Sequence, residues 1–290
     1  MKETNELRAL MQLLDDPDPD VYQSVRHRIL SIGNEIIPNL EAEWEQANNS
    51  FMQERIEMLI HAMQTEEVEK GLKEWTAAGQ EDLIKGLFLI SKYHYPDLSE
   101  ETLTQKIDKI RRNVWLELNP YLTALEQTKV LTGILFQYYQ FQSTEINYSR
   151  PASFLMAPLL ETKRGNAISI GILQLIIAQL TDIPLKLIQV PEQIILGFFK
   201  KSTIENSHFL PNEILFYVDG ANGQLYAYAE VDKYLKKMNV SDTTACFQPM
   251  SNQDILLLML QEYAKCFNNP ATHYKYEEIL RLAAIIKGGG

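Results

Sequence analysis

The sequence predicts an α+β protein, in which α-helical hairpins lead into a core with a small antiparallel sheet and a pair of helices closes the chain. Three observations support this fold class. Apolar residues recur at helical spacing through the first half, β-like runs bounded by Pro, Asn and Gly follow in the middle, and helical spacing returns near the end. We therefore expect a helical domain over 1–145, a mixed core over 146–250 and a helical tail over 251–290.

The first part consists of predicted helices joined by short turns. Four apolar residues between positions 7 and 14 follow the i, i+3, i+4, i+7 spacing of a helix. The run Asp15–Asp20 contains two prolines, which end that helix, and Asp20 is placed to cap the next one. Gly33 is placed to end the second helix. Further apolar stripes predict helices at 36–44, 56–63 and 83–90, and the short turns between them imply antiparallel hairpins.

The mixed core begins with a strongly apolar segment, 168–180, which is long enough for a buried helix. Three runs rich in Ile, Val, Phe and Tyr then predict strands at 185–190, 194–200 and 214–218. Asp219–Gly223 is a turn signal, and 224–229 is a candidate return strand. Two final apolar segments, 255–267 and 276–286, predict the closing pair of helices.

Charge and composition exclude several classes of protein. The chain has 27 Lys and Arg against 38 Asp and Glu, a net charge of −11, which argues against nucleic-acid or anionic-membrane binding. Its two cysteines, Cys246 and Cys266, rule out a disulfide scaffold and are expected to be buried structural thiols. The N-terminus lacks an apolar targeting core, and Pro184 and polar residues interrupt the longest apolar stretch, so we expect a cytoplasmic protein.

Several runs in the middle of the chain resemble a known family. These are Pro151–Leu155, Leu160–Ile170 and Val190–Leu196, followed by Phe216–Gly223, which is similar to a strand and turn bearing an Asp-Pro-Phe-Asn-Gly motif. Together they resemble the bacterial transglutaminase-like family that has a tetratricopeptide-like tail. The segment Leu13–Glu45 resembles a HEAT-like helical hairpin that some members carry.

The resemblance implies a papain-like core. In active members of that superfamily a Cys opens a buried helix, and a His and an Asp follow on adjacent strands. The thiolate attacks an acyl carbon, the His transfers protons, and the carboxylate orients the imidazole. Carried over position by position, the nucleophile place is Ser169, the base place is Gln193 and the orienting acid is Asp219.

This triad is therefore expected to be degenerate. An amide such as Gln193 is neither an acid nor a base near neutral pH, so it cannot relay a proton for Ser169. We expect a non-catalytic protein- or ligand-binding module, whose partner is another protein or a peptide and which needs no cofactor or metal. Its expected binding residues are Ser169, Gln193, Asp219 and Asn222. The alternative is a weak serine-dependent hydrolase or acyltransferase at Ser169, with His208 or another group as the base.

Structural roles compete with these site roles. Ser169 lies where a helix cap or first-turn serine would lie, just before the apolar run. Gln193 can pair with Asp219 or with the backbone, and Asp219 can form a turn with Asn222 and Gly223.

Overall fold

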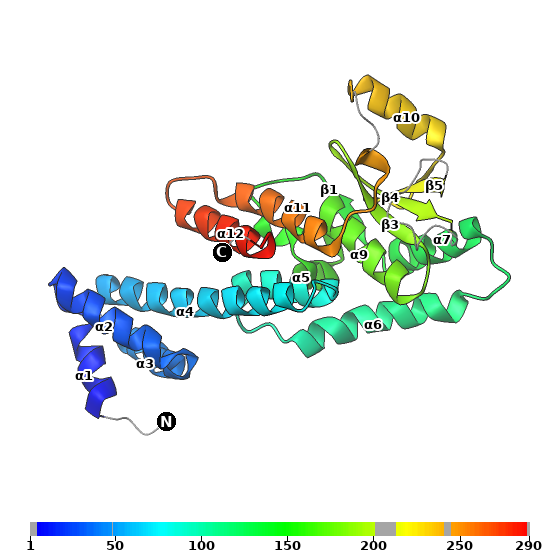
Figure 1. The fold of residues 1–290 in the computed structure, drawn as a ribbon. Helices are drawn as coiled ribbons and strands as arrows, with labels where there is room; N and C mark the ends of the chain where they lie inside the picture. The colour runs from blue at the N-terminus through cyan, green and yellow to red at the C-terminus, as the bar shows by residue number, and fades with distance from the viewer. Residues whose placement is uncertain (1–4, 48, 201–212, 241–244, 289–290) are drawn as a thin grey trace. The chain divides into compact units, whose positions relative to one another are not determined.

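The computed structural model describes residues 5–47, 49–200, 213–240 and 245–288. It confirms the predicted α+β fold, with helices at both ends and a small antiparallel sheet (Figure 1). The chain divides into two compact units, Met1–Gly71 and Leu72–Gly290. This division follows packing, and the predicted domain boundaries after residues 145 and 250 stay predictions. No helix in the described ranges combines the length and the apolar character needed to cross a membrane.

The first unit is a set of helices around its own apolar core. It contains α1 (Asn5–Leu13), α2 (Pro19–Ile32), η1 (Asn34–Ile36), α3 (Ile37–Gln46) and the first part of α4 (Ser50–Ala77). Leucines, isoleucines and valines at the predicted helical spacing form the core, including Leu14, Ile29 and Leu40, which are fully buried.

The loop between α1 and α2 corrects one prediction. The N-cap of α2 is Asp18, whose side chain accepts a hydrogen bond from the backbone nitrogen of Asp20, so Asp20 itself is not the cap. The reason is that Pro19 occupies the first helical position, where a backbone N–H is not needed. The cap is therefore the residue before the proline, Asp18. Gly33 ends α2 as predicted, with a φ of +82°.

The second unit surrounds one central helix. Its helices are α5 (Leu83–His94), α6 (Glu100–Glu117), α7 (Ala124–Thr132), α8 (Met156–Thr162), α9 (Ala167–Leu180), α10 (Tyr228–Lys237), α11 (Asn252–Ala264) and α12 (His273–Ile286). Short turns lie between some of them: the π-helical η2 (Gly133–Tyr138) and the 3₁₀ turns η3 (Pro151–Phe154), η6 (Ala245–Phe247) and η7 (Lys265–Phe267). Residues 168–178 of α9 are all buried, which explains why the helix is apolar on every side.

The main sheet is antiparallel, with strand order β3 (Leu185–Val190), β4 (Gln193–Phe199), β5 (Ile214–Asp219) and β6 (Leu225–Tyr226). The predicted return strand at 224–229 is wrong beyond Tyr226. Val231 and Leu235 are buried four residues apart, so this segment gains more by packing as the helix α10. A second, parallel pair, β1 (Gln142–Thr144) and β2 (Arg164–Asn166), was not predicted.

The two faces of the main sheet have different neighbours. Ile194 of β4 points toward α9, because its Cγ2 lies 2.5 Å from the place that a Cβ on Gly171 would occupy. Ile195 instead belongs to a cluster with Tyr217 of β5 and Val231 of α10. Since side chains alternate along a strand, Gln193 and Asp219 lie on the same face as Ile195 and Tyr217, with the register pairing Ile195 and Asp219.

The closing helices pack against each other, as expected for the predicted pair at 255–267 and 276–286. Each starts three residues earlier than predicted. For α11 the reason is a capping box, in which Ser251 and Asp254 exchange side-chain and backbone hydrogen bonds.

Candidate functional site

A cleft of about 870 Å³ opens where the first turn of α9 meets the β3–β4 hairpin and the end of β5. Its walls come from six separate segments of the second unit. They include Ala167 and Ile168 of α9, the hairpin residues Ile188, Val190, Pro191, Glu192, Gln193 and Ile194, then Asp219 and Ala221, Cys246, Leu258 and Glu262 of α11, and Lys265 of η7. A cleft of this size, mostly apolar with a few polar groups, has the usual character of a ligand site.

Asp219 presents a fixed carboxylate at this cleft. Its Oδ1 accepts hydrogen bonds from the backbone nitrogens of Ala221 (2.7 Å) and Asn222 (3.3 Å). Its Oδ2 accepts a hydrogen bond from the hydroxyl of Tyr226 at 3.1 Å. Burial, helped by the nearby Asp219 charge, raises the pKa of Tyr226, so this hydroxyl stays protonated as a donor. The carboxylate therefore both forms the turn and lines the cleft.

Gln193 lies in the same cleft at the start of β4, opposite Val190 in the strand register. Gln193 is exposed, Ile194 is partly buried, and residues 195–199 of the strand are buried. Gln193 and Asp219 therefore both line this cleft, from the neighbouring strands β4 and β5. An amide there offers one acceptor and two donors but no titratable group.

Ser169 is held away from the cleft by its own hydrogen bonds. Its hydroxyl donates to the carbonyl of Ser153 at 2.8 Å and accepts from the backbone nitrogen of Asn166 at 3.2 Å. Its own backbone nitrogen donates to Oδ1 of Asn166, which completes a capping box at the start of α9. Ser169 is 1% exposed, and the residues of α9 that face the cleft are Ala167 and Ile168.

The turn that follows β5 is hydrogen-bonded to α9 and to β4. The amide of Gln174 donates to the carbonyls of Gly220 (2.7 Å) and Asp219 (3.3 Å), which ties α9 to the end of β5. Gly220 also donates its backbone N–H to the carbonyl of Ile194 at 2.7 Å. These bonds fix the turn that carries Asp219 relative to α9 and β4.

Comparison with protein families matches residues 101–261, more than half of the chain, to the transglutaminase-like superfamily. The chain belongs to the transglutaminase-like superfamily. Searches of curated proteins and of solved structures found no match. The matched segment runs from α6 through most of α11 and contains Ser169, Gln193, Asp219 and Asn222. The compact unit Met1–Gly71 lies outside it.

Asn222 forms the turn of this transglutaminase-like domain rather than a wall of the main cleft. Its Oδ1 accepts a hydrogen bond from the backbone nitrogen of Gln224 at 2.8 Å, and its side chain is exposed. It lines a neighbouring hollow of about 720 Å³ between Phe136, Phe141 and the β1 strand. That hollow shares Ile146, Ala167 and Ala221 with the main cleft.

The sequence does not predict three of the residues that line the cleft, which are Tyr148, Glu262 and Lys265. The Tyr148 hydroxyl donates to Oε2 of Glu262 at 2.8 Å, and the Lys265 ammonium pairs with Oε1 of Glu262 at 2.6 Å. This group joins α11 to the exposed segment before η3, 114 residues earlier in the chain. No local sequence pattern marks such a long-range contact.

The remaining sequence candidates have simpler positions. His208 lies outside the described residues. Cys246 is buried among apolar residues at the edge of the cleft, as predicted, and Cys266 is half-buried. Among the residues with described placement, no three His, Cys, Asp or Glu side chains gather into a metal-binding group.

Burial raises the pKa of the Cys266 thiol to about 11, which gives a testable reactivity. In a Cys246→Ala variant, we expect Cys266 to react with a disulfide reagent at pH 8 on the order of 100-fold more slowly than free cysteine does, because the thiolate is the reactive form. The rate should rise about tenfold per pH unit toward pH 11. Reaction as fast as that of the urea-unfolded protein would contradict the buried position.

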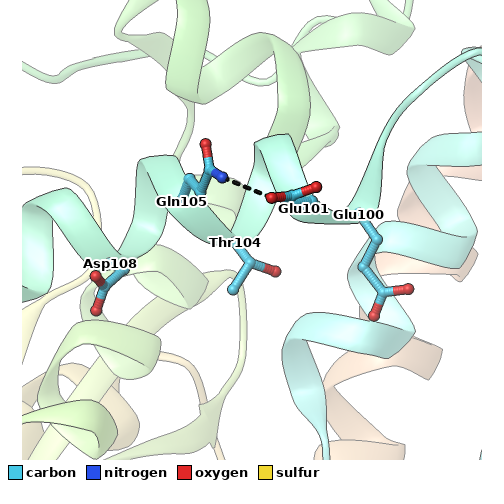
Figure 2. Close-up of a pocket in the computed structure, with 5 residues that line it drawn as sticks. All are labelled: Glu100, Glu101, Thr104, Gln105 and Asp108. Carbon is cyan, nitrogen blue, oxygen red and sulfur yellow. Dashed lines mark hydrogen bonds between the residues drawn. The ribbon is translucent and has the colours of Figure 1, made fainter.

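A separate surface hollow, on α6, is lined by Glu100, Glu101, Thr104, Gln105 and Asp108 (Figure 2). Its carboxylates already have partners. Glu100 pairs with Lys85, Glu101 accepts a hydrogen bond from Gln105 at 3.0 Å, and Asp108 pairs with Arg111 and Arg112. Because all these residues lie on one helix and their charges are balanced, this hollow does not compete with the cleft as a site.

Proposed function

We propose that the protein is a non-catalytic transglutaminase-like module that binds a protein or peptide segment in the cleft beside Gln193 and Asp219. The observation that carries the proposal is the bonding of Ser169. Its hydroxyl is buried and bonded to Ser153 and Asn166, while the residue at the base place is an amide.

The chemistry of acyl transfer needs more than this arrangement supplies. A serine hydroxyl becomes a nucleophile only when an adjacent base takes its proton, and none of the described hydrogen-bond partners of Ser169 is a base. Loss of a triad base costs on the order of 10⁴-fold in turnover. We therefore assign Ser169 to the cap of α9 and treat the serine-hydrolase alternative as an outcome of the test.

The cleft retains what binding requires. Ile188, Val190 and Ile194 provide an apolar wall, and Gln193 and Asp219 provide polar groups that can accept or donate hydrogen bonds. The proposal includes a HEAT-like front and a tetratricopeptide-like tail, because helical repeats commonly present faces to protein partners. It also includes a cytoplasmic location.

The absence of catalysis is tested with a fluorophosphonate probe and with ester and amide substrates. We expect no labelling and no turnover above that of the Ser169→Ala variant, since the hydroxyl has no base. Labelling of the wild-type protein that disappears in Ser169→Ala would overturn the non-catalytic assignment and support the serine-dependent hydrolase.

Binding is tested with 12-residue peptides selected on the wild-type protein from a displayed library. Gln193→Arg places a larger, charged side chain in the cleft from an exposed position, so we expect the selected peptides to bind at least tenfold more weakly. The matched control is Gln224→Arg, an exposed residue that does not line the cleft, which should change the affinity less than twofold. Equal affinity for all three proteins would refute the cleft as the binding site.

A further inference from the structure

The negative charge of the chain is concentrated in the unit that lies outside the transglutaminase-like match. Residues 1–71 contain 15 acidic and 6 basic residues, a net charge of −9 out of the −11 of the whole chain. Residues 72–290, three times as many, carry the remaining −2. A charge imbalance this local produces a strong field over one small unit.

Within that unit, the α3–α4 hairpin carries most of the net negative charge. Positions 37–69 hold eight glutamates and a single basic residue, Arg55. The guanidinium of Arg55 donates to the carbonyls of Leu14 (2.6 Å) and Asp16 (2.7 Å) and lies 4.1 Å from the ring centres of both Tyr22 and Phe51. Because Arg55 is committed to the interior of the unit, it does not neutralise the outer surface of the hairpin.

One surface of the hairpin combines these carboxylates with exposed apolar side chains. We call it the α3–α4 acidic face and define it by two i, i+3, i+4 triplets: Glu41, Trp44 and Glu45 on α3, and Glu54, Glu57 and Met58 on α4. The two triplets meet where the indole nitrogen of Trp44 donates to Oε1 of Glu57 at 3.0 Å. Trp44 is 39% exposed and Met58 57% exposed, and the four glutamates are exposed.

We propose that the α3–α4 acidic face docks a Lys/Arg-rich amphipathic segment of a partner protein. Exposed Trp and Met side chains are typical anchors of protein interfaces. The surrounding glutamates favour a partner segment that is positively charged. In the described part of the chain, Glu41, Glu45 and Glu54 have no ion pair, so their charges are available to a basic partner.

The negative charge of the face disfavours a second copy of the chain, a nucleic acid or an anionic lipid as its partner. A second copy of the chain would bring the same glutamates into contact, and like charges across an interface cost several kcal/mol. Nucleic acids and anionic lipids are repelled for the same reason. A segment with Lys or Arg on one side and Leu or Met on the other satisfies both the carboxylates and the apolar anchors.

The test uses the full chain and a synthetic 14-residue amphipathic helical peptide of Lys and Leu, with binding measured by fluorescence anisotropy at physiological salt. Glu41→Lys with Glu45→Lys reverses two charges of the face, and at position 45, in the last turn of α3, Lys is also favourable for the helix. The matched control, Asp97→Lys with Glu117→Lys, makes the same change in net charge at exposed residues of the second unit. We expect at least tenfold weaker binding in the first variant and less than threefold weaker binding in the control.

The apolar contribution is tested separately with Met58→Gln, which keeps the helix and the charge and should weaken binding about threefold to tenfold. A Lys/Leu peptide of the same composition in scrambled, non-amphipathic order should bind at least tenfold more weakly than the amphipathic one. Equal losses in the two charge-reversal variants, or equal binding of the two peptides, would overturn the proposal by showing only non-specific attraction. Absence of binding to the wild-type protein would overturn it as well.

Discussion

Replacing Gly220 by alanine is expected to destabilise the folded protein by about 3 kcal/mol, the upper end of the cost of overpacking a core. A Cβ at this position would lie 2.6 Å from the carbonyl oxygen of Ile194 and 2.7 Å from its Cγ2. The first contact is with backbone, which cannot rotate away as a side chain can. Relief requires the turn to move, and this strains the hydrogen bonds from Gly220 to Ile194 and from Gln174 to Gly220. Urea denaturation followed by circular dichroism measures the loss.

Gly133→Ala is the matched control for that change. Gly133 has helical backbone angles, and a Cβ there would have no atom within 4 Å. Alanine at a helical glycine is favourable by about 0.5–1 kcal/mol, so this variant should be as stable as the wild-type protein or more stable. If Gly220→Ala proved as stable as Gly133→Ala, the close contact between the turn and β4 would be wrong.

The parts of the fold that were predicted correctly are those whose signal is local. The helix α9 is apolar on every side because it is buried on every side, and the strands β3 to β5 are short runs of β-branched and aromatic residues between turn residues. The turn signal Asp219–Gly223 predicts a return strand at 224–229, but the strand ends at Tyr226. Only contact with the sheet shows that Val231 and Leu235 point the same way from a helix.

The candidate site also has features that the sequence can indicate and features that depend on long-range contacts. Gln193 and Asp219 line one cleft because they lie at the ends of neighbouring strands, and the order of these strands along the chain is visible in the sequence. That Ser169 turns toward Ser153 depends on a contact with η3, 16 residues earlier, and the Tyr148–Glu262–Lys265 group depends on one across 114 residues. Such contacts depend on the packing of whole elements, which no short sequence pattern contains.

The hydrogen bonds around Asp219 explain how the cleft keeps its shape with a glutamine at position 193. Asp219 is held by donors from Ala221, Asn222 and Tyr226, and the turn is held by Gln174, so none of these bonds needs an imidazole at position 193. In the proposed non-catalytic module, the geometry of the cleft therefore persists through structural hydrogen bonds alone. Substitutions in this network should change stability first and binding only as a consequence.

We expect Ser169→Ala to lower the free energy of unfolding by about 2–3 kcal/mol. The change leaves the buried N–H of Asn166 and the carbonyl of Ser153 without their partner, and an unsatisfied buried group costs about 1–3 kcal/mol. Ser251→Ala removes a capping-box hydroxyl at an exposed helix start and should cost only about 1 kcal/mol. At temperatures where both variants are folded, each should bind the cleft-selected peptides as the wild-type protein does. A Ser169→Ala variant of unchanged stability that lost binding would instead place the hydroxyl in the cleft and contradict its role as a helix cap.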